Sequence, residues 1–441
     1  MVSRACQRQL LAACLLLIWL APSVPAQSDP AGGASLKQIE HSIEQGRLAE
    51  IERPLLDYAV AHPKDVRALE LLGRVRHRQG RLEEAQALFQ RVLTLDPASV
   101  GAKLNLAHVM HELGRREEAR QLLNEIELVP VAAAPELRLS LVKALLLIGE
   151  PRQALAAADK LPNRVKTVQA LPVIAASHLA SGERQRLTAL IPQMKKTAVA
   201  NPVVAAQCAE VLQKAGMVQQ AVGLLRLALG TAPNHAGVLV SLGRLETEAR
   251  DFAPARRHLN RALALVPRSA DVFSALAALE NAEGNTIAAL ESVSQARSMA
   301  PDSAPIMAQF VLTAMRAGRP QAAVEAATAL LKLQPDEAES LYLFGAASLH
   351  SGKLAAAQNA LARYVQQRPD DPRGCLALGL ALAGQRDQPA ATKSRFARCL
   401  HLDPANVEAK YQLSLLHKEE GKADEAIRLL EDVTARAPRH A

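Results

Sequence analysis

The chain has 441 residues and a formal net charge of +8 at pH 7. A single hydrophobic core rarely serves a chain of this length, so several domains or a repeat array is expected. The basic excess is mild and permits an acidic partner, but it does not indicate a nucleic-acid-binding protein.

Residues 1–26 are predicted to be a secretory signal peptide. Arg4 and Arg8 precede the apolar run Leu10–Ala21, and Val24-Pro25-Ala26 offers a small-residue cleavage site near Ala26. An uncleaved anchor is the first alternative. Lipidation at Cys14 is the second and is disfavoured, because Cys14 lies at the beginning of the apolar run. We therefore expect a periplasmic or secreted protein, with no transmembrane helix in the mature chain.

A polar linker is expected over residues 27–34. The first helical hairpin, Ser35–Pro63, is irregular, since Ile39 and Ile51 stand where later hairpins have small residues. Such irregularity is typical of a terminal repeat, which packs on one side only.

The segment Val66–Ser99 gives the pattern that the rest of the chain repeats. It predicts two antiparallel helices that end at Gly80 and at Asp96-Pro97. Gly73 and Ala85 are the small residues placed where the two helices must approach closely. One such hairpin cannot bury its apolar face alone, so it must be stacked on others.

The pattern recurs with a period of 34 residues. The closing proline returns within two runs, one of Pro63 and Pro97 and one of Pro233, Pro267, Pro301, Pro335 and Pro369. The small residue of the second helix is Ala85, Ala119, Ala221, Ala255, Ala289, Ala323 and Ala357. After a one-residue insertion Thr392 takes this place, followed by Ala426. A fixed period of this length predicts an all-α solenoid.

This spacing, with Gly73, Phe89 and the closing proline, resembles the tetratricopeptide repeat (TPR) family. The resemblance covers about residues 32–440, with room for about twelve hairpins. An aromatic residue near the start of the first helix is kept at Phe273 but replaced by Leu69, Met307 and Leu341. The resemblance implies a right-handed α-solenoid whose first helices line a concave groove.

Two arrays are expected, an N-terminal one over 35–201 and a regular one over 202–441. Within 130–201 the period slips, and Pro172 and Pro192 fall inside predicted helices. An interior proline removes a hydrogen bond and clashes with the preceding turn. We therefore predict kinked or shortened helices there.

Neither catalysis nor a cofactor is indicated. The sequence has no Gly-rich phosphate loop, nucleophile elbow, paired-cysteine metal motif or His-Glu-x-x-His motif. Cys208, Cys375 and Cys399 fall on apolar repeat positions and are predicted to be buried; redox or metal roles are the alternative. The best metal candidate is His108 with His111 and His77, but no fourth ligand is evident, so solvated histidines are favoured over a metal site.

The resemblance places candidate partner-binding residues on the first helices. At the N-terminal end they form a mainly basic set: Arg67, Glu70, Arg74, His77, Arg78, His108 and His111. At the C-terminal end they form an apolar set: Leu312, Met315, Tyr342, Leu349, Leu376, Leu380, Tyr411 and Leu415. A solvated helix face explains the first set equally, and packing between first helices the second.

These features favour a non-catalytic scaffold or adaptor of the bacterial cell envelope that binds proteins or peptides. One alternative is a protein that binds an anionic polysaccharide and serves a polysaccharide export system. The other is an accessory subunit of an envelope enzyme. Self-association through the last hairpin is a further option, because no extra helix follows it, although Asp424, Glu425 and Arg428 favour a polar, solvated end.

Overall fold

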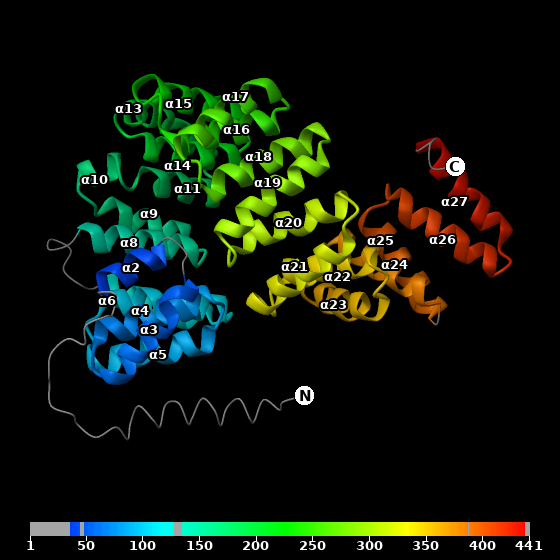
Figure 1. The fold of residues 1–441 in the computed structure, drawn as a ribbon, viewed down its shortest axis with the longest axis horizontal. Coiled ribbons are helices and arrows are strands. Elements are labelled where there is room, and N and C mark those ends of the chain that lie inside the picture. The colour runs from blue at the N-terminus through cyan, green and yellow to red at the C-terminus, as the bar shows by residue number, and fades with distance from the viewer. Residues whose placement is uncertain (1–35, 45–47, 128–134, 387, 437–441) are drawn as a thin grey trace. The chain divides into compact units, whose positions relative to one another are not determined.

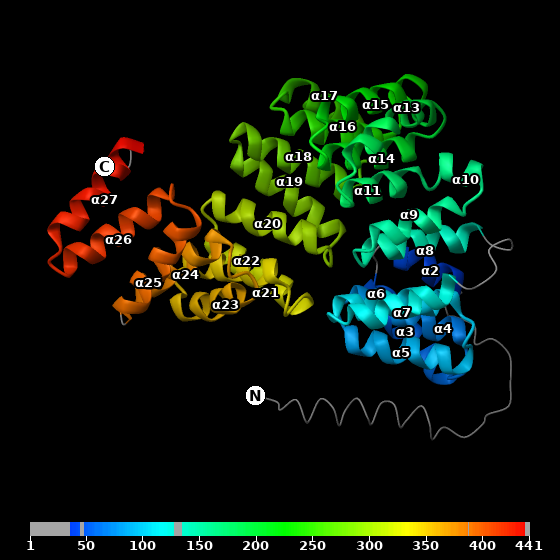
Figure 2. The same cartoon turned by 180° about the vertical axis from the view of Figure 1, so that it is seen from behind.

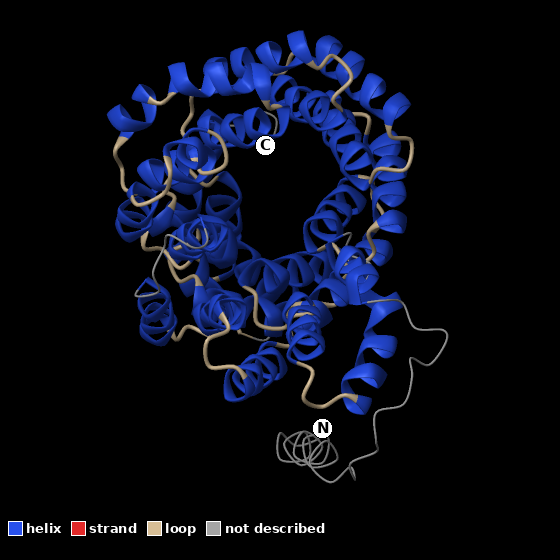
Figure 3. Cartoon of the chain, turned by 90° about the vertical axis from the view of Figure 1, so that its left-hand side faces the viewer, coloured by secondary structure: helices blue, strands red, loops and turns tan. Residues whose placement is uncertain are grey.

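The computed structural model describes residues 36–44, 48–127, 135–386 and 388–436, and these form helices and short connections without a β-strand (Figure 3). The predicted signal peptide and linker lie outside the described residues. The chain divides into two compact units, the first ending at Leu245 and the second beginning at Glu246. Each unit is described by itself.

The first unit contains the helices up to α15 and most of α16 (Figure 1). Their bounds are α2 (Leu36–Glu44), α3 (Leu48–Ala61), α4 (Val66–Arg78), α5 (Leu82–Leu95), α6 (Val100–Glu112), α7 (Arg116–Glu127), α8 (Pro135–Leu147), α9 (Pro151–Asp159), α10 (Asn163–Thr167), α11 (Leu171–Ala180), α12 (Arg184–Ala189), α13 (Ile191–Ala200), α14 (Pro202–Lys214), α15 (Val218–Thr231) and α16 (Ala236–Glu248).

The second unit contains the remaining helices. Their bounds are α17 (Phe252–Leu265), α18 (Ala270–Glu283), α19 (Thr286–Met299), α20 (Ala304–Arg316), α21 (Pro320–Leu333), α22 (Ala338–His350), α23 (Leu354–Gln367), α24 (Pro372–Gln385), α25 (Pro389–Leu402), α26 (Val407–Glu419) and α27 (Ala423–Arg436). Consecutive helices pack as hairpins, α18 on α19, α20 on α21 and so on to α26 on α27. This is the α-solenoid architecture that the 34-residue period predicts.

Capping side chains and glycines mark the ends of the helices. The residue two places after a closing proline often caps the next first helix: Asp65 accepts hydrogen bonds from the amides of Arg67 and Ala68, both at 3.0 Å. Ser99 caps α6 and Asn406 caps α26 in the same way. At the end of α4, Gly80 adopts φ +72°, the left-handed conformation that closes the hairpin turn.

The small-residue register is confirmed. The alanines at 85, 119, 221, 255, 289, 323 and 357 are fully buried, and Thr392 and Ala426 are nearly so. Gly73 shows why a small residue is needed: a Cβ atom there would lie 2.6 Å from Cε1 of Phe89. Gly345 faces Leu361 and Gly379 faces Phe396 at similar distances. The core is therefore a series of clusters between neighbouring helices, and Figure 2 shows α4 to α7 side by side.

The shortened helices predicted between 130 and 201 are confirmed. The second helix that begins at α9 stops at Asp159 and is followed by the short α10, and the next first helix is reduced to α11, with Pro172 in its first turn. A second helix is broken at Leu190 into α12 and α13, with Pro192 in the first turn of α13. Proline at the start of a helix loses no hydrogen bond, so the chain places both prolines there by ending the preceding helix early.

We expect amide hydrogens in residues 160–195 to exchange faster than those in 270–360. Short helices have few internal hydrogen bonds and open locally at a lower free energy than full-length hairpins. Hydrogen–deuterium exchange read by mass spectrometry on the full chain measures this directly. Equal protection of the two regions would contradict the expectation.

Two arginines occupy the left-handed position that glycine takes in most hairpin turns. Arg250 has φ +60° and Arg386 has φ +58°, whereas Gly216, Gly284 and Gly352 stand at the equivalent places. A residue with a Cβ atom pays about 1–2 kcal/mol for this conformation, partly offset by the greater unfolded-state entropy of glycine.

Arg250→Gly and Arg386→Gly should each therefore raise the free energy of unfolding by about 0.5–1 kcal/mol. Urea unfolding followed by circular dichroism measures the change. Arg319→Gly is the control, since Arg319 has φ −112° and gains nothing from glycine. A loss of stability in both test variants would show that the arginine side chains contribute more than the backbone strain costs.

Candidate protein-binding surface

The basic set lies on α4 and α6, but its arginines have partners. Arg67 and Arg74 both reach Glu40 of α2, with nitrogen–oxygen distances of 2.5 and 3.5 Å. Arg78 donates a hydrogen bond to the backbone carbonyl of Ile43. Glu40 thus holds two of the arginines with a single negative charge, and the carbonyl of Ile43 fixes the third without balancing its charge.

His77, His108 and Glu112 lie together. Nε2 of His77 is 3.1 Å from one carboxylate oxygen of Glu112, and Nε2 of His108 is 3.0 Å from the other. The two imidazole rings meet edge to face, with centroids 4.5 Å apart. Burial alone would raise the pKa of Glu112, but hydrogen bonds with His108 and His77 lower it to about 2.

Glu112 was missed in the sequence. Its signal was available, because it follows His108 by four residues and so shares its helix face. His111, which the sequence pairs with His108, is not in this cluster. Burial, followed by the charge of Arg116, lowers the pKa of His111. Both effects favour the neutral form of the imidazole.

Glu70 occupies the remaining position of the basic set. Its carboxylate accepts a hydrogen bond from the side-chain amide of Asn105 at 3.2 Å, which links α4 to α6. Burial raises the pKa of Glu70, and nearby Arg74 and Arg67 counteract this rise only in part. First helices of adjacent hairpins are thus tied to each other by polar contacts at this end.

The apolar set lies on α20, α22, α24 and α26, at helix positions related by the repeat. Tyr342, Leu376 and Tyr411 are equivalent, and so are Leu312, Leu380 and Leu415, once the insertion before Thr392 is counted. Positions four residues apart on one helix share a face. We call this set of eight residues the apolar row.

The side chains of the apolar row are neither fully buried nor fully exposed to solvent. Leu312 is 41% exposed, and the other seven side chains are half-buried. Met315, Leu349, Leu376 and Leu380 pack with one side against core clusters. The side chains of the apolar row are therefore held in place by the core on one side and present apolar surface to solvent on the other. Such a surface can bind a partner.

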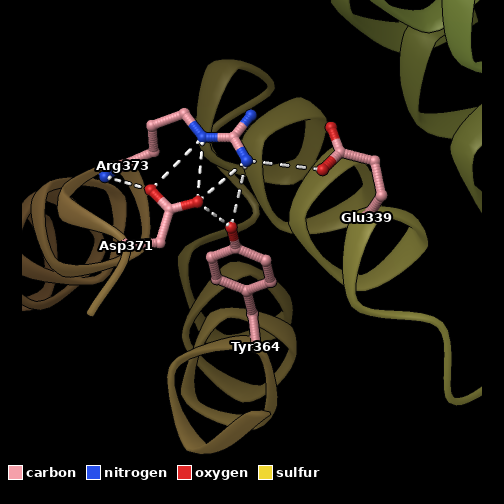
Figure 4. A network of polar contacts seen from close by, with 4 residues as sticks. All are labelled: Glu339, Tyr364, Asp371 and Arg373. Atoms are coloured by element: carbon pink, nitrogen blue, oxygen red, sulfur yellow. Dashed lines mark hydrogen bonds and ion pairs between the residues drawn. The ribbon is translucent and has the colours of Figure 1, made fainter. Parts of the chain in front are cut away.

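Tyr342 of the row is held by an aromatic and a cationic neighbour. The centroid of the Tyr342 ring lies 5.2 Å from that of the Tyr364 ring. The guanidinium carbon of Arg373 lies over the Tyr342 ring, 4.8 Å from the ring centroid. Arg373 also pairs with Asp371 at 2.9 Å and with Glu339 at 3.5 Å, and Tyr364 donates to Asp371 (Figure 4). This network joins α22, α23 and α24.

The Asp371 network predicts a pH dependence of stability. Burial raises the pKa of Asp371, but hydrogen bonds from Arg373 and Tyr364 overcome this and lower it to about 2. A depressed carboxyl pKa stabilises the fold above the unfolded-state pKa near 3.8, and this contribution is lost as the pH falls toward 2.

Asp371→Asn should lower the free energy of unfolding by about 1–2 kcal/mol at pH 7 and by progressively less from pH 4 to pH 2. Asparagine can retain the cap on the amide of Arg373 through its Oδ1. Its NH2 group cannot accept the hydrogen bonds that Oδ2 takes from Tyr364 and Arg373, so the variant removes the charge together with these bonds. Urea unfolding across this pH range gives the difference. The neighbouring, exposed Asp370→Asn should show a difference below about 0.5 kcal/mol at every pH, and an equal effect in both variants would contradict the assignment.

The three cysteines predicted to be buried are buried and free. Burial raises the pKa of the Cys208 thiol to about 12 and that of Cys399 to about 11. Thiols with such pKa values are not nucleophilic at neutral pH. In the part of the chain that the structure describes, no helix has the length and apolar character needed to cross a bilayer.

The chain belongs to the tetratricopeptide repeat family. That family matches residues 76–129, 212–279, 314–374 and 385–441, and a second form of the repeat matches residues 43–100. TPR proteins are in general non-catalytic scaffolds for protein–protein interactions, so the fold is that of a binding protein. Among curated proteins, none matches the chain.

Three proteins of known structure are among those similar to the chain. Yeast Tom70 is 13% identical over 91% of this chain and 91% of its own, with a TM-score of 0.41. MamA from Desulfovibrio magneticus RS-1 is 21% identical over 38% of this chain and 94% of its own, with a TM-score of 0.35. Pseudomonas aeruginosa PilF is 17% identical over 49% of this chain and 96% of its own, with a TM-score of 0.42.

Proposed function

We propose that this protein is a non-catalytic scaffold of the bacterial cell envelope that binds partner proteins along the apolar row. The observation that carries the proposal is the recurrence of half-exposed apolar side chains on one face of successive first helices. A partner segment with apolar side chains at matching intervals would remove this surface from water, and burial of apolar area is the main driving force for association.

The arrangement also favours specificity. Leu312, Leu380 and Leu415 come from three different hairpins, the first two being two repeats apart and the last two one repeat apart, so an extended partner would contact the row at several separate points. Tyr342 adds an apolar ring held by Tyr364 and Arg373, and a side chain that is already ordered loses little entropy on binding. Aromatic residues of this kind are enriched among the energetically dominant residues of interfaces.

Placement in the envelope rests on the sequence of residues 1–26. A basic start, a short apolar run and a small-residue cleavage site are typical of an export signal. Fractionation of cells that express the full chain and a version lacking residues 2–26 tests this part alone. We expect the full chain outside the cytoplasm and the truncated chain inside it; cytoplasmic retention of both would overturn the placement and leave the binding proposal standing.

Site-specific photo-crosslinking tests the binding proposal. A photoreactive amino acid is placed at Leu312, Leu380 or Leu415 and, as matched controls, at Ile287 or Ile427, which are exposed on second helices. We expect the same discrete protein adduct from the three row positions and none from the controls. Adducts of equal yield at all five positions, or at the controls alone, would move the binding surface away from the apolar row.

The last hairpin is more consistent with a solvated end than with self-association. Asp424, Glu425, Arg428 and Glu431 are exposed on α27, as the polar interpretation expects. Ile427 is the large exposed apolar side chain among them. Charged groups of both signs on a terminal face oppose packing against a second copy, because each would have to lose its water.

A further inference from the structure

We propose that His77, His108 and Glu112 form a binding site for a divalent transition metal, with Zn²⁺ as the fitting ion, that joins two adjacent hairpins. The inference is independent of the protein-binding function. It starts from the fact that one nitrogen from each histidine and one oxygen from the glutamate all lie within 4.8 Å of one another. The ligands come from α4 and α6, which pack against each other.

The donor geometry is close to that of a bound metal. In a tetrahedral zinc site with metal–ligand distances of about 2.0–2.1 Å, neighbouring donor atoms lie about 3.3 Å apart. The two nitrogen–oxygen distances here, 3.1 and 3.0 Å, reach different oxygens of the Glu112 carboxylate, and with a single oxygen the three donors lie within 4.8 Å of one another. An ion between the two Nε2 atoms and the carboxylate would be bound after adjustments of the three side chains that bring these donors closer together.

The donor set selects the class of metal. Two imidazoles with one carboxylate is a combination that suits Zn²⁺ and its neighbours in the first transition row. Mg²⁺ and Ca²⁺ prefer oxygen ligands and would gain little from two nitrogen donors.

The exposure of the ligands gives the site an open side. The side chain of His77 is 16% exposed, and those of His108 and Glu112 are 33% and 38% exposed. Three protein ligands leave one coordination position of a tetrahedral ion for water or for a donor from another molecule. A bound ion would thus link α4 to α6, the first helices of two adjacent hairpins, while remaining accessible to solvent.

The helix positions explain why these groups meet. His108 and Glu112 are four residues apart and share one face of α6. His77 lies in the last turn of α4, one hairpin earlier, and its ring packs edge-on against that of His108. Because the pair of rings and the salt-bridge geometry already order the side chains, a metal would bind without a large loss of side-chain entropy.

Zinc binding to the full chain, free of any affinity tag, tests the proposal. We expect isothermal titration with ZnCl₂ at pH 7.5 to show one ion per chain, and the melting temperature to rise with added Zn²⁺ but not with Mg²⁺. Co²⁺ in place of Zn²⁺ should give the intense visible absorption of a tetrahedral or five-coordinate ion. Absence of binding by both ions overturns the proposal.

Matched variants locate the site. His77→Gln, His108→Gln and Glu112→Gln should each weaken Zn²⁺ binding by about tenfold or more, since even partners outside the ligand shell cost 10–100-fold. His111→Gln and His258→Gln are the controls: His111 neighbours Glu112 but is outside the cluster, and His258 pairs with Glu246 elsewhere. Circular dichroism establishes that each variant is folded before titration.

The outcomes are distinct. Loss of binding in the three ligand variants with retention in both controls supports the site. Retention in His77→Gln and His108→Gln, or an equal loss in His111→Gln, places the ion elsewhere and overturns it. Crosslinking at the apolar row is a separate measurement, so a failure of the metal site and a failure of the protein-binding surface cannot be confused.

Discussion

Ala289→Glu and Ala323→Glu should each lower the free energy of unfolding by about 3–5 kcal/mol, the cost of an uncompensated buried charge. Both alanines are fully buried at helix–helix contacts in the second unit. A glutamate there must either force the hairpin apart or place its carboxylate in an apolar contact without a partner. Thermal and urea unfolding of the full chain measure the loss.

Ile287→Glu is the matched control for this effect. It introduces the same side chain two residues earlier on the same helix, where the native isoleucine is 56% exposed. We expect a change within about 0.5 kcal/mol, as for surface substitutions in general. Near-native stability of both alanine variants would mean that these positions face solvent and that the assignment of the 34-residue register is wrong.

Phe396→Ala should cost about 3–5 kcal/mol, because a fully buried aromatic ring is replaced by a cavity between α24 and α25. The ring lies against Gly379, where a Cβ atom would come within 2.7 Å of Cε1 of Phe396. Gly379→Ala should therefore also destabilise the protein, by about 1–3 kcal/mol, although alanine favours a helix more than glycine does.

The two substitutions should compensate each other in part. With the ring removed, the alanine methyl at 379 has room, so the double variant should be more stable than the sum of the single effects predicts, by about 1 kcal/mol or more. Gly223→Ala is the control, because a Cβ atom there meets nothing within 4 Å, and it should stabilise its helix. Additive effects at 379 and 396 would show that the glycine and the ring do not share one space.

The fold was predictable because its information is local and repeated. Ala255, Ala289 and Ala357 recur at a constant interval, and the requirement behind that interval, a small side chain between two helices, is the same in every hairpin. Even the weak region could be located, because Pro172 and Pro192 are incompatible with a helix interior whatever the surroundings.

The partners of the candidate site were less predictable, because they depend on how hairpins pack. Glu40 meets Arg67 and Arg74, and Glu112 meets His77, across helices whose offset follows from packing rather than from spacing along the chain. Single-sequence reasoning assigned charge to the basic set side chain by side chain. The structure shows that Glu40 of a neighbouring helix pairs with two of its arginines and Glu112 with its histidines His77 and His108.

The apolar row shows a different limit. The sequence indicated which of its members share a helix face, but not how far each is covered by the next hairpin. That degree of coverage depends on the close approach that Gly345 and Gly379 permit. Half-burial of Leu349, Leu376 and Leu380 is thus a property of the packed array and not of any one repeat.

The neighbour-to-neighbour packing has a consequence for how the chain acquires its structure. Within each unit the main contacts join helices that are adjacent or next but one in order, with wider steps where α8, α11 and α14 meet at the broken helices. Chains with such short-range topology lose little loop-closure entropy before their contacts form, so they nucleate at many points and grow rapidly outward. Synthesis of the polypeptide can then proceed alongside its folding, one hairpin at a time.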